Sequence, residues 1–133
     1  MNTKALMVSS SFFMGVLGVL FSFLPQEVLS YVGATPNNIV PLFIQVLGGL
    51  YIAFAMINWT VRTNLIGGIY YRPVTMGNFI HFFIGDLALV KGIRGVQAST
   101  TLLAVLIIYL VFAILFGIVL FTHPLKSDGA KRS

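Results

Sequence analysis

Four long apolar stretches, separated by connections rich in polar and turn-forming residues, dominate the pattern of this chain. They cover residues 5–24, 39–59, 74–90 and 101–122. A helix needs about 20 mostly apolar residues to cross a hydrocarbon core about 30 Å thick, so each stretch approaches the length of a membrane span. The third is the shortest, and it reaches that length when Pro73 and Lys91 extend its ends. The pattern predicts an all-α protein, a four-transmembrane-helix bundle forming one domain over residues 1–133, with a polar tail at residues 124–133.

The connections and the first apolar run predict further local structure. Residues 26–32 suit two turns of interfacial helix on the outer surface, which Gly33 would end. Residues 91–99 form a short connection containing glycine, so the third and fourth spans are expected to be antiparallel neighbours. The first apolar run is longer than the roughly 7 to 15 residues of a signal-peptide core, and we therefore expect it to be retained as a span.

The composition is that of an integral membrane protein. The mean hydropathy is +0.98, and 58% of the residues are hydrophobic while only 8% are charged. A soluble domain has roughly 25% charged residues. The chain contains no cysteine, which excludes disulfides, thiolate metal sites and thiol nucleophiles.

The basic residues predict how the chain is oriented in the membrane. Most of them fall on the side of the N-terminus, the second connection and the tail: Lys4, Arg62, Arg72, Lys126, Lys131 and Arg132. The opposite side has Lys91 and Arg94. Cytoplasmic segments are enriched in Lys and Arg, so both termini are predicted to be cytoplasmic. The net charge of +5 fits this topology and an attraction to anionic headgroups, and we expect no nucleic-acid partner.

Three polar side chains, Asn78, His81 and Asp86, interrupt the third apolar stretch. An Asp at the centre of a membrane helix costs roughly 2.5 to 3.5 kcal/mol on insertion scales, so such residues need partners or a function. On a helical wheel one arc holds the small and polar residues, with Thr75 and Asp86 at its edge: Gly77, Asn78, His81, Gly85 and Ala88. The opposite side is predicted to face lipid: Met76, Phe79, Ile80, Phe83, Leu87 and Val90.

The second span has a matching face, made of Gln45, Gly48, Gly49, Ile52 and Met56. Counting about 1.5 Å per residue from the outer ends of these antiparallel spans places Gln45 level with Asp86. The same counting places His81 near the level of four residues on the other spans: Gly15, Gly48, Gly49 and Tyr109. We therefore predict a polar spot among small residues in mid-membrane, which is either a tight packing junction or a small cavity.

Both structural and functional roles are open for these residues. In the structural role Asp86 bonds Gln45, or pairs with Lys91 or Arg94, and a neutral His81 donates to a carbonyl or to Tyr109. In the functional role the candidate ligand-binding residues are His81, Asp86, Asn78, Gln45 and Tyr109. The glycines are predicted to serve close helix packing: Gly15, Gly18, Gly48, Gly49, Gly77 and Gly85.

Several chemistries are excluded by the positions of the candidate residues. A haem held by two histidines needs both at similar depth, whereas His123 lies at the cytoplasmic end of the fourth span, far from His81. Two histidines and one intramembrane carboxylate at different depths do not make a zinc site. His81 and Asp86 lie about 140° apart on the wheel, so neither can orient the other in a catalytic triad with Ser9, Ser10 or Ser11. We expect no catalytic residue, metal or cofactor.

The stretch from Phe23-Leu24-Pro25 through Gln45-Val46-Leu47-Gly48-Gly49-Leu50-Tyr51, with the polar third span, resembles the DoxX-like group of small four-helix membrane proteins. The resemblance is to an uncharacterised branch and covers most of the chain. Members are mostly membrane proteins of unknown function, some linked to redox or oxidative-stress systems. That group often has an arginine just before the glycines, a neighbourhood that Gln45 occupies here. More remotely, sterol-isomerase-like membrane proteins share the architecture and bind lipids in an intramembrane cavity.

Two functional hypotheses follow. The first is a non-enzymatic accessory, assembly or interaction subunit, located in a bacterial inner membrane as a multi-pass protein. Its partners would be membrane lipids together with a second copy of the chain or a larger membrane protein. The second is an intramembrane binder or enzyme for a lipid, quinone or other apolar small molecule, with a polar site around His81. A transporter is a third reading that needs an oligomer or partner, since four helices are few for alternating access.

Overall fold

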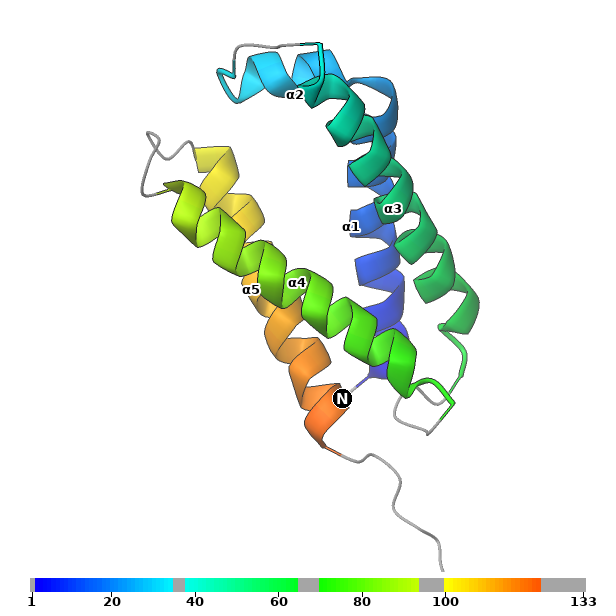
Figure 1. The fold of residues 1–133 in the computed structure, drawn as a ribbon. Helices are drawn as coiled ribbons and strands as arrows, with labels where there is room; N and C mark the ends of the chain where they lie inside the picture. The colour runs from blue at the N-terminus through cyan, green and yellow to red at the C-terminus, as the bar shows by residue number, and fades with distance from the viewer. Residues whose placement is uncertain (1, 35–37, 65–69, 94–99, 123–133) are drawn as a thin grey trace, which may run out of the picture. The chain divides into compact units, whose positions relative to one another are not determined.

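The computed structural model describes residues 2–34, 38–64, 70–93 and 100–122, and these residues are helical apart from short turns. Five helices follow one another along this part of the chain (Figure 1): α1 (Thr3–Phe23), α2 (Pro25–Tyr31), α3 (Val40–Val61), α4 (Arg72–Ile93) and α5 (Thr100–Phe121). The helices α1, α3, α4 and α5 are each long and apolar enough to cross a membrane. The prediction of an all-α protein with four membrane-length helices is therefore confirmed.

The third membrane-length helix is longer than its apolar stretch. Helix α4 begins at Arg72 and ends at Ile93, so it includes Pro73 in its first turn and Lys91 in its last. Proline is tolerated there because the first N–H groups of a helix have no partner within it. The ends extend α4 to the same length as α3 and α5. Arg94, His123 and the predicted tail lie outside the described residues.

The short helix α2 is bounded by a proline and a glycine. Pro25 is its first residue and disfavours a helical conformation at Leu24, which ends α1 there. At the other end Gly33 has φ of +71°, Gly33 N–H donates to Ser30 O at 3.1 Å, and Ala34 N–H donates to Leu29 O at 3.0 Å. These two bonds make a Schellman motif, which favours glycine at the left-handed position. The predicted helix in this connection, and its end at Gly33, are confirmed.

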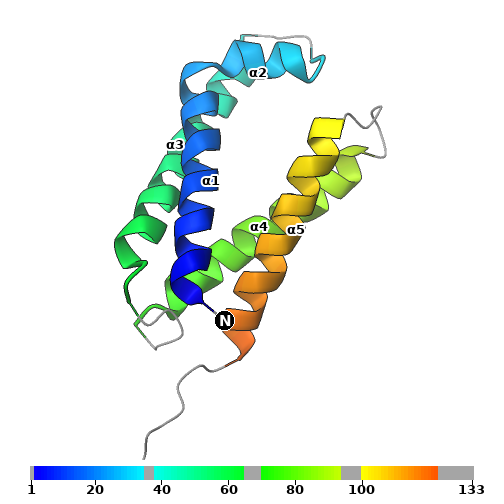
Figure 2. The same ribbon diagram turned by 180° about the vertical axis from the view of Figure 1, so that it is seen from behind.

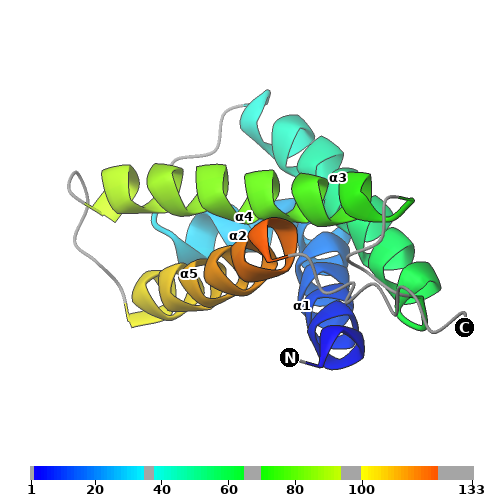
Figure 3. The same cartoon turned by 90° about the horizontal axis from the view of Figure 1, so that it is seen from below.

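The chain divides into two compact units, Met1–Thr63 and Asn64–Ser133, and each is described by itself. In the first unit α1 and α3 lie side by side, and α2 runs across one end of the pair (Figure 2). In the second unit α4 lies along α5, as a view from a third direction also shows (Figure 3). The single domain expected from the sequence stays a prediction.

The α1–α3 interface is a close approach of two helix backbones. A Cβ atom at Gly18 would lie 2.9 Å from Ile52 N, and one at Gly48 would lie 2.6 Å from Ser22 N. Neither position has room for a side chain unless the backbones separate. Gly15 lies further out, since a Cβ there would be 3.7 Å from Ala55 Cβ, an ordinary contact. Small residues thus bring α1 and α3 together, as they do in other membrane helix pairs.

The α4–α5 interface is aromatic. Phe82 is fully buried, and its ring stacks on Phe112 at a centroid distance of 4.8 Å and on Phe116 at 5.9 Å. The wheel placed Phe79 on the lipid side. Instead its ring packs edge-on to Phe121 at 5.8 Å, and a Cβ at Gly117 would lie 3.2 Å from it. The physical reason is that a glycine on α5 leaves a gap which a large ring fills, so the contact face of α4 extends beyond its polar arc.

Candidate functional site

His81 and Tyr109 face each other across the α4–α5 interface. The Tyr109 hydroxyl lies 3.5 Å from His81 Nε2, at the long limit of a hydrogen bond. Either the hydroxyl donates to an unprotonated Nε2, or a protonated Nε2 donates to the hydroxyl oxygen, according to the tautomer. Tyr109 is buried and His81 is half-buried. The pair joins two residues that depth counting had placed at the same level.

Aromatic rings hold this pair in place. The His81 ring packs edge-on to Phe82 at 5.1 Å, and Phe82 packs edge-on to Tyr109 at 5.2 Å. Gly85 makes room for the tyrosine, because a Cβ there would lie 2.5 Å from Tyr109 Cε1. Gly77, the other glycine flanking His81 on the wheel, is half-buried on α4. His81 therefore packs against the rings of Phe82 and Tyr109, and Gly85 leaves the room that the Tyr109 ring occupies.

Asp86 has an unsatisfied oxygen. Its Oδ1 is buried, and no hydrogen-bond donor reaches it from the described residues. Lys91, the basic residue on the same helix that the sequence offered as a partner, forms no ion pair with it in that part of the chain, and Arg94 lies outside the described residues. An unpaired buried carboxylate oxygen costs several kcal/mol in hydrocarbon, roughly as much as a backbone group left without a bond there.

Gln45, the other partner predicted for Asp86, is exposed within its own unit. Its Nε2 donates to the Ser22 carbonyl at 3.4 Å and so links α3 to α1 at the end of the pair next to α2. Gln45 and Asp86 belong to different units. Their pairing, and the neighbourhood of His81 with Gly48 and Gly49, stay predictions.

Asn78 is fully buried, one turn from His81 on α4. Its Nδ2 donates to the Val74 carbonyl at 2.9 Å, and Thr75 Oγ1 donates to the Tyr71 carbonyl at 3.3 Å. Each of these bonds returns to the backbone of α4 four residues earlier. Such bonds let polar residues remain in an apolar helix without leaving their donors unpaired.

Sequence reasoning missed a polar network between α1 and α3. Asn58 is fully buried, and its Nδ2 donates to Ser10 Oγ at 3.1 Å, while Ser10 Oγ donates to the Met7 carbonyl. Ser11 Oγ donates to the Ala55 carbonyl at 2.6 Å. The signal was present, because Asn58 lies near the C-terminal end of the second span, at the depth of the Ser9 to Ser11 run near the N-terminal end of the first. The polar groups here serve helix association.

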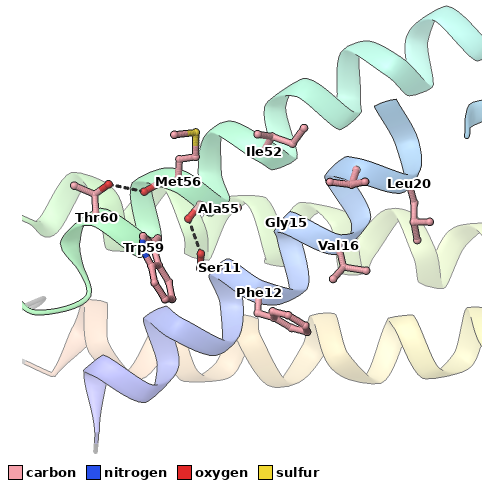
Figure 4. A pocket seen from close by; sticks show the side chains of 11 residues that line it. Ser11, Phe12, Gly15, Val16, Leu20, Ile52, Ala55, Met56, Trp59 and Thr60 are labelled. Carbon is pink, nitrogen blue, oxygen red and sulfur yellow. Dashed lines mark hydrogen bonds between the residues drawn. The ribbon is translucent and has the colours of Figure 1, made fainter. Parts of the chain in front are cut away.

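Sequence reasoning also missed a groove between α1 and α3, with a volume of about 630 Å³ (Figure 4). We call it the α1–α3 groove. Its lining is small where the helices meet, at Ser11, Gly15 and Ala55, and large along its flanks, at Phe12, Val16, Leu20, Ile52, Met56 and Trp59. His81 and Asp86 are not part of it. Gly49 lies away from these contacts, since a Cβ there would meet nothing within 4 Å.

Within the described ranges, no group of three or more His, Cys, Asp or Glu side chains is placed to hold a metal ion. The chemistry that this arrangement offers is a histidine–tyrosine hydrogen bond and an unpaired carboxylate oxygen on one membrane-length helix. The chain matches no family model, no curated protein and no solved structure, so its resemblance to the DoxX-like group stays a prediction.

Proposed function

We propose that this small membrane protein is a non-enzymatic assembly subunit, which binds another membrane helix through Asp86 of α4. The observation that carries the proposal is the buried Oδ1 of Asp86, which no donor reaches among the described residues. Carboxylates within membrane helices almost always pair with a basic or hydrogen-bonding group. A donor from a second copy of the chain or from a larger membrane protein would supply that group.

The position of Asp86 supports this role. From Asp86 to the last residue of α4, Ile93, a helix rises about 10 Å, which is too far for the short Asp side chain to reach the interface. Asp86 is half-buried, and leaving its buried Oδ1 without a partner costs about 1 to 3 kcal/mol, so an available donor is favoured. The other buried polar side chains already have hydrogen-bond partners within their own unit: Ser10, Ser11 and Asn58 in the first, Thr75 and Asn78 in the second.

The orientation belongs to the same proposal. We place both termini on the cytoplasmic side of a bacterial inner membrane, with the positively charged residues near Lys4, Arg62 and Arg72 facing the cytoplasm. Asp86 is then in the outer half of the membrane, and the partner group lies at that depth.

The test is assembly of the detergent-purified protein, measured by native mass spectrometry. The wild type is expected to carry a second copy or a partner chain, and Asp86→Leu is expected to lose it. Glu27→Gln is the matched control, because Glu27 is an exposed acid on α2 outside the membrane-length helices. A monomer without partners in the wild type, or an unchanged assembly in Asp86→Leu, contradicts the proposal.

An internal partner, Gln45, is the competing explanation and can be tested separately. The chain contains no cysteine, so Gln45→Cys with Asp86→Cys introduces the only thiols. A disulfide that forms in high yield within a monomer would mean that Asp86 is satisfied inside the chain, and the assembly proposal would fail. If no disulfide forms within the monomer, Gln45 is excluded as the internal partner; because Asp86→Cys lacks the carboxylate, this variant does not itself test assembly.

A second candidate function rests on the His81–Tyr109 pair. An ionisable side chain within a membrane helix, hydrogen-bonded to a buried tyrosine, suits the binding of an apolar molecule with one polar group, such as a quinone or sterol. Organic extraction of the purified protein tests it. A defined small molecule present in the wild type and lost in His81→Phe, but kept in His81→Gln, supports this role, and its equal presence in all three excludes it.

A further inference from the structure

We propose that the α1–α3 groove binds an acyl chain of an anionic phospholipid, whose headgroup lies against Arg62. This binding site is distinct from Asp86 and His81, and it does not depend on the assembly role. Four features of the first unit support it: the chemistry of the groove, its length, its small-residue floor and the cation at its mouth.

The groove is built for hydrocarbon. Its flanks are the exposed side chains of Phe12, Val16, Met56 and Trp59, which come from two membrane-length helices. The hydroxyl of Ser11 at the floor does not present a free polar group, because it donates to the Ala55 carbonyl at 2.6 Å (Figure 4). A flexible chain of methylene groups fits such a surface better than any polar ligand.

The length of the groove matches one leaflet. Thr60 of α3 lines one end of the groove. Because Asn58 of α3 bonds Ser10 of the antiparallel α1, Thr60 lies near the level of Val8. From that level to Leu20 a helix rises about 18 Å. Half of a hydrocarbon core about 30 Å thick is about 15 Å, so an acyl chain of one leaflet would occupy most of the length of the groove.

Small residues leave the space that the chain would occupy. Gly15 lines the groove, and a Cβ added there would lie 3.7 Å from Ala55 Cβ, an ordinary van der Waals distance. The first carbon of a side chain at Gly15 therefore fits between the helices, and the rest of a larger side chain would take up space in the groove that Gly15 lines. This position therefore separates occupancy of the groove from the stability of the pair.

The mouth of the groove has a positioned cation. The Arg62 guanidinium lies 3.9 Å over the Trp59 ring, and its Nη1 donates to the Trp59 carbonyl. Trp59 lines the groove, so this cation–π contact fixes a positive charge at its rim. Lys4 lies at the same end of the antiparallel pair. A guanidinium beside an interfacial tryptophan is suited to a lipid phosphate, which accepts several of its N–H groups.

The experiment offers the purified protein an equimolar mixture of phosphatidylglycerol and phosphatidylcholine with identical acyl chains, and counts bound lipids by native mass spectrometry. The wild type is expected to retain phosphatidylglycerol in preference. Arg62→Gln is expected to lower this preference about fivefold, the effect of one basic residue at an anionic surface. Gly15→Leu is expected to lose retention of both lipids, because it fills the groove.

Two controls make the result decisive. Gly49→Leu adds the same side chain to α3 where a Cβ meets nothing within 4 Å, and Lys91→Gln removes an exposed positive charge at the far end of α4. Both should retain lipid as the wild type does. Equal retention of the two lipids by the wild type, full retention by Gly15→Leu, or equal losses in Gly15→Leu and Gly49→Leu would each overturn the proposal.

Discussion

The two helix pairs of this protein use glycine in opposite ways. In the α1–α3 pair, Gly18 and Gly48 let two backbones touch, and polar side chains bond across the interface. In the α4–α5 pair, Gly85 and Gly117 each accept the edge of an aromatic ring from the facing helix. A backbone cannot move aside as a ring can. Replacing a glycine should therefore cost more stability in the α1–α3 pair than in the α4–α5 pair, and substitutions can test this difference.

The largest effect is expected at the centre of the aromatic pair. Phe82→Ala removes a fully buried ring that contacts Tyr109, Phe112 and Phe116. We expect a loss of about 3 kcal/mol in the free energy of unfolding, at the low end of the range for Phe in soluble cores. We use the low end because the unfolded protein is in lipid or detergent rather than in water. The loss then comes mainly from the packing contacts of the ring, with little contribution from its transfer out of water. Titration of detergent micelles with SDS measures it.

Phe83→Ala is the matched control for that prediction, because Phe83 is the neighbouring ring and is exposed. Its effect should be well under half of that of Phe82→Ala. Equal losses at the two positions would mean that the rings of α4 do not distinguish core from lipid, and the aromatic description of the pair would be wrong.

The next effect tests backbone contact. Gly48→Ala places a Cβ 2.6 Å from Ser22 N and 2.9 Å from Gly18 O, so α1 and α3 must separate. Overpacking of this kind costs about 1 to 3 kcal/mol, and we expect about 2 kcal/mol here because these two backbone atoms, unlike the Ser22 hydroxyl that the Cβ would also meet, cannot rotate away. Unfolding in SDS measures the loss. Gly49→Ala should have almost no effect, and a loss as large as that of Gly48→Ala would show that helix propensity rather than contact decides.

Gly48 and Gly49 also show how much of the structure can be predicted from the sequence. Apolar length and Pro25 and Gly33 were enough to predict the four membrane-length helices and the short helix between the first two. Depth counting placed Tyr109 at the level of His81, and their side chains lie 3.5 Å apart. The wheel gave equal status to Gly48 and Gly49, whereas a Cβ at Gly48 meets backbone and one at Gly49 meets nothing within 4 Å.

The rest could not be predicted because a wheel gives the faces of one helix and not its rotation against a partner. A rotation of one residue, about 100°, decides whether Phe79 faces lipid or Gly117. The α1–α3 groove is likewise a property of two helices together, since its floor comes from Gly15 on one and Ala55 on the other. Asn58 was overlooked because it lies near a helix end, where polar residues are common.

A smaller effect is expected from the polar network of the α1–α3 pair. Asn58→Leu removes the bond from Nδ2 to Ser10 Oγ in a fully buried site. Hydrogen bonds between membrane helices are worth about 0.6 kcal/mol on average and about 1.7 kcal/mol at most, so we expect a loss near 1.5 kcal/mol for this buried amide. Ser10→Ala with Asn58→Leu should cost little more than Asn58→Leu alone. Additive losses in this double-mutant cycle would show that the two groups do not act through their bond.

The smallest effect on stability is expected for Gly85→Ala, where the added Cβ meets a ring and not a backbone. Gly85→Ala places a Cβ 2.5 Å from Tyr109 Cε1, a closer approach than that of Gly48 to Ser22 N, yet the obstacle is a side chain. We expect a loss of about 1 kcal/mol in the free energy of unfolding, the lower end of the overpacking range, because the ring can rotate away.

The movement of the Tyr109 ring should also lengthen the distance of 3.5 Å between its hydroxyl and His81 Nε2, which a stability measurement does not detect. Nitrogen NMR of labelled histidine should therefore report a changed His81 in Gly85→Ala and in Tyr109→Phe, and an unchanged one in Gly48→Ala. If Gly85→Ala destabilises as much as Gly48→Ala and leaves the His81 signal unaltered, the ring is as immovable as a backbone, and the distinction between the two pairs disappears.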